Sequence, residues 1–407
     1  MNAEDSSSAD VRYVAAEKAR RLILASAAVG VVGIGLAFAS SFLASHGFRH
    51  FLFAYVINFC YFLSLSLGAL FFVLLHHVTR AGWSVVLRRM AEVMASAIPF
   101  WGLLFLPILL LVLTGNGSLY SWNDANVVQH DELLQKKAAY LNAPFFAIRA
   151  IGYFALWTAI AWYYRRNSLL QDDTADKSLT LRMQKWSGPG LLVYAGTVSF
   201  ASFDWLMSLS PHWFSTIYGV YFFSGCAVGV FATLVLAAVV LQQRGFLQDS
   251  ITTEHYHDLG KFLFGFVFFW GYIAFSQYLL IWYANIPEET TWFLVRQSGG
   301  WLWISLLLLF GHLLVPFCGL MSRSVKRNKF ALAGWSAFLL VMHWIDLYWL
   351  VMPQLSKAGP VFGFVDLFCL VGFGGIYMAV VLQIATGRAL VPVKDPWLAE
   401  SLAFKNV

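Results

Sequence analysis

The chain has 407 residues, of which 59% are hydrophobic, 17% are aromatic and only 12% are charged, with a formal net charge of +6. A soluble domain has about 25% charged residues, so this composition excludes a soluble enzyme, a disordered chain and a disulfide-rich secreted module. The four cysteines stand far apart without a CxxC or CxxCH motif, and we expect no haem c, iron–sulfur cluster or other metal site in this chain.

Ten apolar segments follow one another along the chain, and each has roughly the 20 residues that a helix needs to cross a bilayer. They predict an all-α, polytopic membrane protein with ten transmembrane helices. The segments are Leu22–Ala44, Phe51–Leu75, Val93–Leu113, Phe145–Tyr164, Gly190–Ser210, Ile217–Leu241, Phe262–Ala284, Trp301–Met321, Phe330–Met352 and Phe362–Gly387. The membrane domain is therefore expected at 22–387, between an N-terminal segment at 1–21 and a C-terminal tail at 388–407.

The distribution of Lys and Arg predicts how the chain is oriented, because cytoplasmic loops carry an excess of these residues. Of the 27 Lys and Arg residues, 21 fall on the side that holds the N-terminus. Both termini are therefore expected in the cytoplasm, and the positive charge belongs to helix flanks rather than to a nucleic-acid site. Two connections are predicted to be longer than the others, Thr114–Pro144 outside and Arg165–Pro189 inside.

Short sequence matches that lie four spans apart indicate an internal repeat. The matches, in chain order, are Phe100-Trp101-Gly102 with Phe269-Trp270-Gly271, Arg166-Asn167 with Arg327-Asn328, and Asp204 with Asp346, each aspartate standing seven residues before a proline. Helices four spans apart cross the membrane in the same direction. The pattern predicts two parallel four-helix bundles, 51–210 and 217–352, to which the first and tenth spans are added.

Charged residues inside a span cost several kcal/mol to insert, so they are candidate functional groups. Asp204, His343, Asp346 and Asp366 all fall in the outer half of the membrane, and His343 shares a helix face with Asp346. Glu92 stands at the cytoplasmic start of the third span. Together they form a candidate proton pathway, because buried carboxylates and histidines suit reversible proton transfer. The alternative interpretation is structural, with each carboxylate held by tryptophan N–H groups or backbone.

A weaker alternative involves the histidines alone. His312 in the eighth span and His343 in the ninth lie at similar depths on consecutive helices, as two axial ligands of a haem b would. Buried histidines that serve only packing are more common. The haem b pair is therefore kept as a secondary hypothesis.

Several strings of residues resemble a known family. They are Arg88-Arg89-Met90-Ala91-Glu92, Asp204-Trp205-Leu206-Met207-Ser208-Leu209, Tyr283-Ala284-Asn285-Ile286-Pro287-Glu288-Glu289 and His343-Trp344-Ile345-Asp346. The strings resemble the NrfD-like, polysulfide-reductase-type membrane subunits, and more narrowly the F-type membrane subunit of alternative complex III. The resemblance extends over essentially all ten spans.

The resemblance implies a place in a bacterial inner-membrane complex that oxidises menaquinol or ubiquinol and passes electrons to a periplasmic acceptor. The electrons pass through iron–sulfur clusters and haem c, which partner subunits carry, so this chain is expected to hold no cofactor. The implied partners are a homologous ten-helix quinol-binding subunit, an iron–sulfur subunit, multihaem cytochrome c subunits and membrane lipids, with a terminal oxidase as a further candidate.

One departure from the family pattern concerns the third span. The quinol-binding sister subunit is expected to have a histidine shortly after its third-span proline, whereas this chain has the wholly apolar run Pro107-Ile108-Leu109-Leu110-Leu111. A quinol site in the first bundle is therefore not expected. Ser276, Gln277 and Tyr278 in the seventh span are a weak candidate for a quinone pocket.

The main hypothesis is a redox-silent subunit that supports the quinol-binding sister and conducts protons through half-channels. The first alternative is a redox subunit that binds quinone or haem b. The second is a stand-alone secondary transporter, since parallel repeats and buried acids also suit that class. The transporter would be favoured by a helix broken at mid-membrane, and no clear Gly or Pro break of that kind is expected from the sequence.

Overall fold

The computed structural model describes the backbone of residues 16–405 and the side chains of residues 19–405, and within that range it is helical without a strand. Ten helical segments there are long and apolar enough to cross a membrane, so the prediction of an all-α polytopic membrane protein is confirmed. The helices are α2 (Ala16–Ser41), α3 (Gly47–Val78), α4 (Val85–Ala95), α5 (Ile98–Leu113), α6 (Ala125–Gln129), α7 (Glu132–Lys137), α8 (Ala143–Thr174), α9 (Lys177–Trp205), α10 (Tyr218–Gln243), α11 (Thr253–Ala284), α12 (Pro287–Arg296), α13 (Gly299–Leu307), α14 (Val315–Met321), α15 (Arg323–Arg327), α16 (Lys329–Val351), α17 (Phe364–Ala385) and α18 (Leu398–Leu402).

The connection predicted at 165–189 is wrong, because nearly all of it is helical. Helix α8 continues to Thr174 and α9 begins at Lys177, so only two residues join them. Ala175 ends α8 in the left-handed conformation with φ at 57°, and the Asp176 side chain caps α9 by accepting a hydrogen bond from the Ser178 N–H. Charged residues mark the end of the apolar core, but they do not interrupt backbone hydrogen bonding.

Two spans are less regular than the sequence predicts. The third consists of α4 and α5, separated by a tight turn at Ser96 and Ala97, because Pro99 has no N–H to continue the helix. The eighth contains a π-helical segment, η3 (Leu308–Leu314), between α13 and α14. The turn of the third span lies near the start of the predicted segment Val93–Leu113, and backbone hydrogen bonds from both Ser96 and Ala97 close it.

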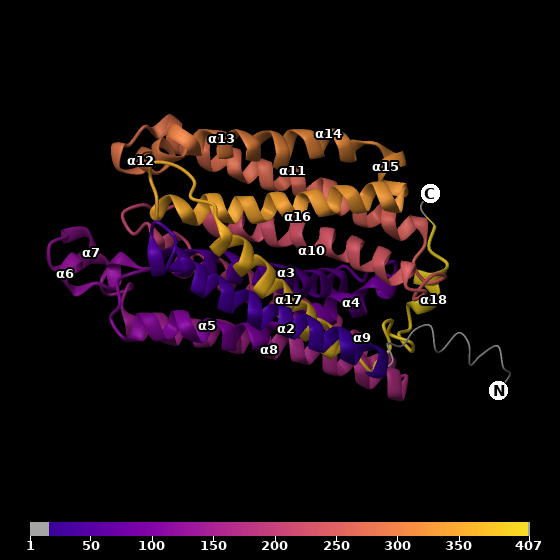
Figure 1. Ribbon diagram of the computed structural model, residues 1–407. Helices are drawn as coiled ribbons and strands as arrows, with labels where there is room; N and C mark the ends of the chain where they lie inside the picture. Colours follow the sequence, from indigo (N-terminus) through magenta and orange to yellow (C-terminus); the bar gives the residue numbers. More distant parts are fainter. Residues whose placement is uncertain (1–15, 406–407) are drawn as a thin grey trace.

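The helices gather in two groups that meet along α3 and α10 (Figure 1). The first group contains α3, α4, α5, α8 and α9, and the second contains α10, α11, α13, η3, α14 and α16. Helix α3 lies deepest, with 94% of its most apolar window buried. We call the end of the molecule with α6, α7 and α12 the loop face, and the end with α15 and α18 the terminal face (Figure 1).

The first and last spans, α2 and α17, pack against each other along most of their length. Glycines permit this close approach: a methyl group on Gly33 would lie 2.7 Å from the Cα of Gly372, and one on Gly375 would lie 2.6 Å from the backbone N of Gly30. Small residues allow such contacts in membranes, where dispersion forces replace the hydrophobic effect between helices. The pair lies against α3, mainly through α17.

Candidate functional site

Asp204 near the end of α9 is fully buried and held by an arginine from α8. The Arg149 Nε lies 2.8 Å from Oδ2 and its Nη2 lies 2.9 Å from Oδ1, so the guanidinium binds both carboxylate oxygens. The Tyr153 hydroxyl donates a third bond at 2.8 Å. Such a bidentate pair fixes the geometry and compensates the buried charge. This carboxylate therefore ties α8 to α9 at the loop-face end of the first group.

Asp346 near the end of α16 is also buried, but its two recorded hydrogen bonds come from neutral donors. The Tyr221 hydroxyl of α10 donates to Oδ1, and the Trp270 indole N–H of α11 donates to Oδ2 at 3.1 Å. Among the described residues no ion pair includes Asp346. A charge on an unpaired carboxylate in an apolar interior is costly, so this site is suited to gaining and losing a proton.

The contrast is sharper because the two aspartates stand at equivalent places in the predicted repeat. The arginine before the eighth span, Arg296, donates instead to the carbonyls of Trp349 at 3.3 Å, Leu350 at 2.9 Å and Trp292 at 3.0 Å. Burial lowers the pKa of its guanidinium to about 9, which still leaves it positively charged at neutral pH. Its charge complements the carbonyl end of α16 rather than the Asp346 carboxylate.

The two histidines of the haem b hypothesis make different contacts. His343 Nε2 is 2.8 Å from the Ser64 Oγ, and its ring fills space beside Gly225, where a Cβ would come within 2.6 Å of the imidazole. His312 lies in η3 and stacks on Trp270 with ring centroids 4.0 Å apart. Neither of its nitrogens has a hydrogen-bond partner among the described residues. The haem b pairing stays a prediction.

Asp366 at the start of α17 is fully buried and links that helix to α3. Its Oδ2 lies 2.9 Å from the His50 Nε2 and accepts a bond from the Gly363 N–H at 2.9 Å. The second contact caps α17, as carboxylates commonly do at helix N-termini. This arrangement resembles a structural clamp between two helices more than a step in a proton path.

Glu92 lies on the terminal face inside a buried network of charges. Arg89 Nε is 3.1 Å from Glu92 Oε2, and Arg89 Nη2 is 2.8 Å from Asp172 Oδ2. Arg88 pairs with Asp395 of the C-terminal tail and lies 3.6 Å from the other Glu92 oxygen. The network joins α4, α8 and the tail. In the sequence, this network is signalled by Arg88 four residues and Arg89 three residues before Glu92, a spacing that lets both arginines reach the carboxylate on one helix face.

A cavity of about 470 Å³ opens on the outside of the second group, beside the Asp346 cluster. Gln277 and Tyr278 line it, but Ser276 does not. Successive helical residues point about 100° apart, so the three cannot all face one cavity. Tyr221 and Trp270, the two donors to Asp346, also line it, together with Arg296.

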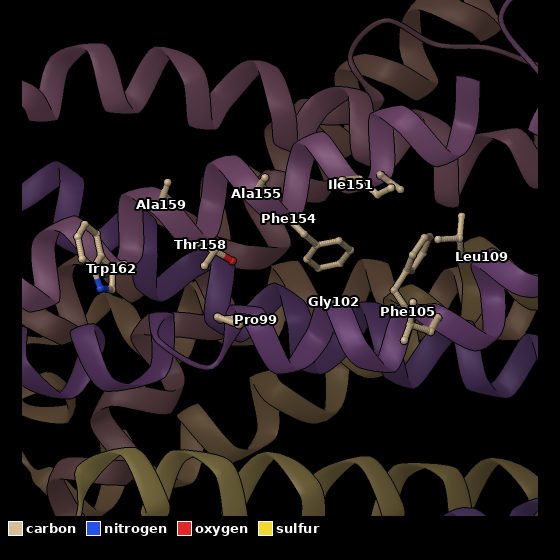
Figure 2. Close-up of a pocket in the computed structure, with 12 residues that line it drawn as sticks. Pro99, Gly102, Phe105, Leu109, Ile151, Phe154, Ala155, Thr158, Ala159 and Trp162 are labelled. Atoms are coloured by element: carbon tan, nitrogen blue, oxygen red, sulfur yellow. The ribbon is translucent and has the colours of Figure 1, made fainter. Parts of the chain in front are cut away.

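A second cavity, of about 590 Å³, occupies the corresponding place between α5 and α8 of the first group (Figure 2). Its lining is apolar apart from the hydroxyl of Thr158 and the indole N–H of Trp162, as Figure 2 shows for the facing helices. Gly102 follows Trp101 here as Gly271 follows Trp270 in the other cavity. The polar groups are therefore concentrated in only one of two similarly placed cavities.

Neither protein-family models nor curated protein sequences match this chain. Within residues 16–405 no group of three or more His, Cys, Asp or Glu side chains is arranged to hold a metal ion. The partners of the buried carboxylates, Arg149 and Tyr221 above all, are not among the residues predicted from the sequence. A lone arginine inside the otherwise apolar fourth span is the only signal that points to the first of them.

Proposed function

We propose that this chain is a redox-silent membrane subunit of a bacterial respiratory quinol:electron-acceptor oxidoreductase of the alternative complex III type. It supports the sister quinol-binding subunit, and both of its ends face the cytoplasm. The iron–sulfur clusters and haem c reside in partner subunits. Support comes from the family-like strings and from a ten-span helical architecture that such a subunit needs.

The observation that carries the proton role is the difference between the two carboxylates that correspond in the predicted repeat. Asp204 is compensated by a bidentate arginine, whereas Asp346 is held by a tyrosine and a tryptophan. Proton transfer needs a group whose two protonation states lie close in energy. We therefore assign proton transfer to Asp346, with His343 one turn before it, and a structural role to Asp204.

The first test determines which subunits and cofactors are isolated together with this chain. The native membrane is solubilised gently, the chain is isolated, and subunit masses are taken with a redox difference spectrum. Copurification of a multihaem cytochrome c and a large iron–sulfur subunit is the expected result. A colourless chain that is isolated alone contradicts the proposal and favours a transporter, and a haem b band on the chain alone favours the redox alternative.

The second test uses the intact complex in proteoliposomes. Asp346→Asn is expected to assemble and to oxidise quinol while translocating fewer protons per electron. The conservative variant Asp346→Glu is the control, because it keeps a titratable group and is expected to restore part of the loss. An unchanged proton-to-electron ratio in Asp346→Asn would remove the proton role and leave the supporting role.

A further inference from the structure

A third cavity, of about 400 Å³, lies in the first group between the start of α5 and the polar end of α8. The predicted apolar segment Phe145–Tyr164 ends here, and the next two residues, Arg165 and Arg166, both line the cavity. Trp162, a residue type that is enriched at membrane interfaces, lines it as well. The cavity therefore lies at the depth where lipid headgroups meet the hydrocarbon core.

The two arginines are not neutralised by direct partners, because no ion pair within residues 19–405 includes either of them. Arg166 places its guanidinium over the Trp162 ring, with the Cζ 4.9 Å from the ring centroid. Arg165 donates from Nη2 to the Ile384 carbonyl at 3.0 Å, and its Nη1 is buried with no hydrogen-bond partner in the same range. A buried donor without a partner is costly, above all on a charged group, so this site favours an acceptor from outside the chain.

The surrounding charged groups leave the cavity positive. Glu92 and Asp172 attract Arg165, but each is already paired with Arg89, at 3.1 and 2.8 Å. Arg89 and Arg388 repel the same Arg165 guanidinium. An anion at the cavity would therefore meet an excess of positive charge.

The second group treats its corresponding basic pair differently. Arg166 and Arg327 correspond in the predicted repeat, and Arg327 is paired with Glu254 at 2.7 Å. Lys326, which precedes Arg327, donates to two backbone carbonyls at 2.7 and 2.8 Å. Only the first of the two pairs is therefore left with charge that the described part of the chain does not use.

This polar cavity continues into the apolar cavity between α5 and α8, since Pro99, Thr158 and Trp162 line both. In Figure 2 these three residues lie at one end of the apolar cavity, and Leu109 lies at the other. Ten residues of helix separate Pro99 from Leu109, which is about 15 Å. Half of the roughly 30 Å hydrocarbon core has the same depth, so the apolar cavity is as long as one leaflet is thick.

The apolar cavity is open to the membrane. Leu106 and Ile151, which line it, are 46% and 62% exposed and so face the surrounding lipid. A molecule can therefore enter from the side, with its charged end at the arginines and its apolar end between the two helices.

We infer that the two joined cavities bind one anionic phospholipid from the leaflet at the terminal face. Its phosphate lies at Arg165 and Arg166, whose planar guanidinium groups match phosphate oxygens, and one acyl chain lies between α5 and α8. A zwitterionic lipid is disfavoured, because its ammonium group brings positive charge to a positive site. The inference goes beyond the proposed function and does not depend on it: the family resemblance implies membrane lipids in general, whereas these contacts select one headgroup class at one place.

The test is photoaffinity labelling of the purified native assembly in detergent. The probe is a phosphatidylglycerol with a diazirine halfway along one acyl chain, and labelled peptides are mapped. Labels are expected on α5 and α8. Unlabelled phosphatidylglycerol is expected to compete, and phosphatidylcholine at the same concentration is expected to compete far less.

Arg166→Gln should weaken the labelling about fivefold, the equivalent of about 1 kcal/mol for one basic residue at an anionic lipid. Because the Arg166 guanidinium contacts only the Trp162 ring among the described residues, this variant is expected to fold, and an unchanged unfolding temperature confirms that. Arg323→Gln is the matched control. It removes the same charge from the same face of the second group and should label as the wild type does.

Gly102→Leu tests the acyl-chain cavity separately from the charge. A Cβ at Gly102 would lie 3.5 Å from the Phe154 ring, an ordinary contact, so the added side chain is expected to fit in the cavity and to displace the lipid tail. Labelling of α5 and α8 should fall while the unfolding temperature is kept.

The inference is overturned if labels are absent from α5 and α8, or if phosphatidylcholine competes as well as phosphatidylglycerol does. It is also overturned if Arg166→Gln labels no less than Arg323→Gln, or if Gly102→Leu labels as the wild type does. If the chain still copurifies with cytochrome c in any of these cases, the proposed function stands and only the lipid site fails.

Discussion

Replacing Arg149 by methionine removes the cation from Asp204 while keeping most of the side-chain volume. The change deletes hydrogen bonds of 2.8 and 2.9 Å and leaves the buried carboxylate with only the Tyr153 hydroxyl. Breaking a buried pair in this way costs about 3–5 kcal/mol, because one charge stays behind uncompensated. We expect about 3 kcal/mol, the lower end of this range, since the Tyr153 hydroxyl still donates to the carboxylate.

Asp346→Asn serves as the comparison. Its carboxylate has no cation to lose, and asparagine keeps one acceptor oxygen for Tyr221 or Trp270. The expected cost is the loss of one hydrogen bond, about 1 kcal/mol. The double variant Arg149→Met with Asp204→Asn removes both charges of the pair and should regain about 2 kcal/mol of the single-variant loss, because no buried charge is left unpaired.

Unfolding can be followed in detergent with a thiol-reactive fluorogenic dye, in a Cys318→Ser background that removes the exposed thiol. The remaining thiols are buried and become reactive only when the helices separate: Cys60, Cys226 and Cys369. The reasoning is refuted if Arg149→Met lowers the unfolding midpoint no more than Asp346→Asn does. It is also refuted if the double variant is no more stable than Arg149→Met.

Two further predictions concern packing and pH. Gly33→Leu should lower the unfolding midpoint, because even a methyl group at this position would lie 2.7 Å from the α17 backbone. Overpacking of this kind costs about 1–3 kcal/mol. Gly35→Leu is the control and should be neutral, because a Cβ at Gly35 meets nothing within 4 Å. Hydrogen bonds from the Leu134 N–H and from His212 lower the pKa of Asp131. This stabilisation of α7 is present above the unfolded pKa of about 4 and is lost as pH falls through the lower folded value. The protection of the α7 amides against hydrogen exchange, relative to the unfolded chain at the same pH, should therefore fall in acid, and less steeply in Asp131→Asn.

The ten spans are predictable because membrane insertion imposes one dominant requirement, an apolar stretch of sufficient length. The ends of the helices cannot be predicted in this way, because backbone hydrogen bonding continues beyond the end of the apolar run. Helix α8, for example, continues to Thr174. The break before α5 can be predicted from Pro99, since a proline has no N–H to donate the backbone hydrogen bond that would continue α4.

The candidate site was only partly predictable. Buried carboxylates are visible in the sequence as charges within apolar runs, but their partners lie far along the chain. Arg149 is 55 residues from Asp204, and Tyr221 is 125 residues from Asp346. No local pattern distinguishes a carboxylate that will meet a guanidinium from one that will meet a phenol. That difference, which separates the structural role from the proton role, is decided by which helices become neighbours.

The pairing of α2 with α17 has a consequence for biosynthesis. Helix α2 ends at Ser41 and α17 begins at Phe364, so roughly 320 residues are translated between them, which takes on the order of tens of seconds at about 5–20 residues per second. Throughout that time the glycine face of α2 has no partner. A ribosome product that stops before α17 keeps this face bare in the bilayer, so an incomplete chain displays a feature by which membrane quality control can recognise it.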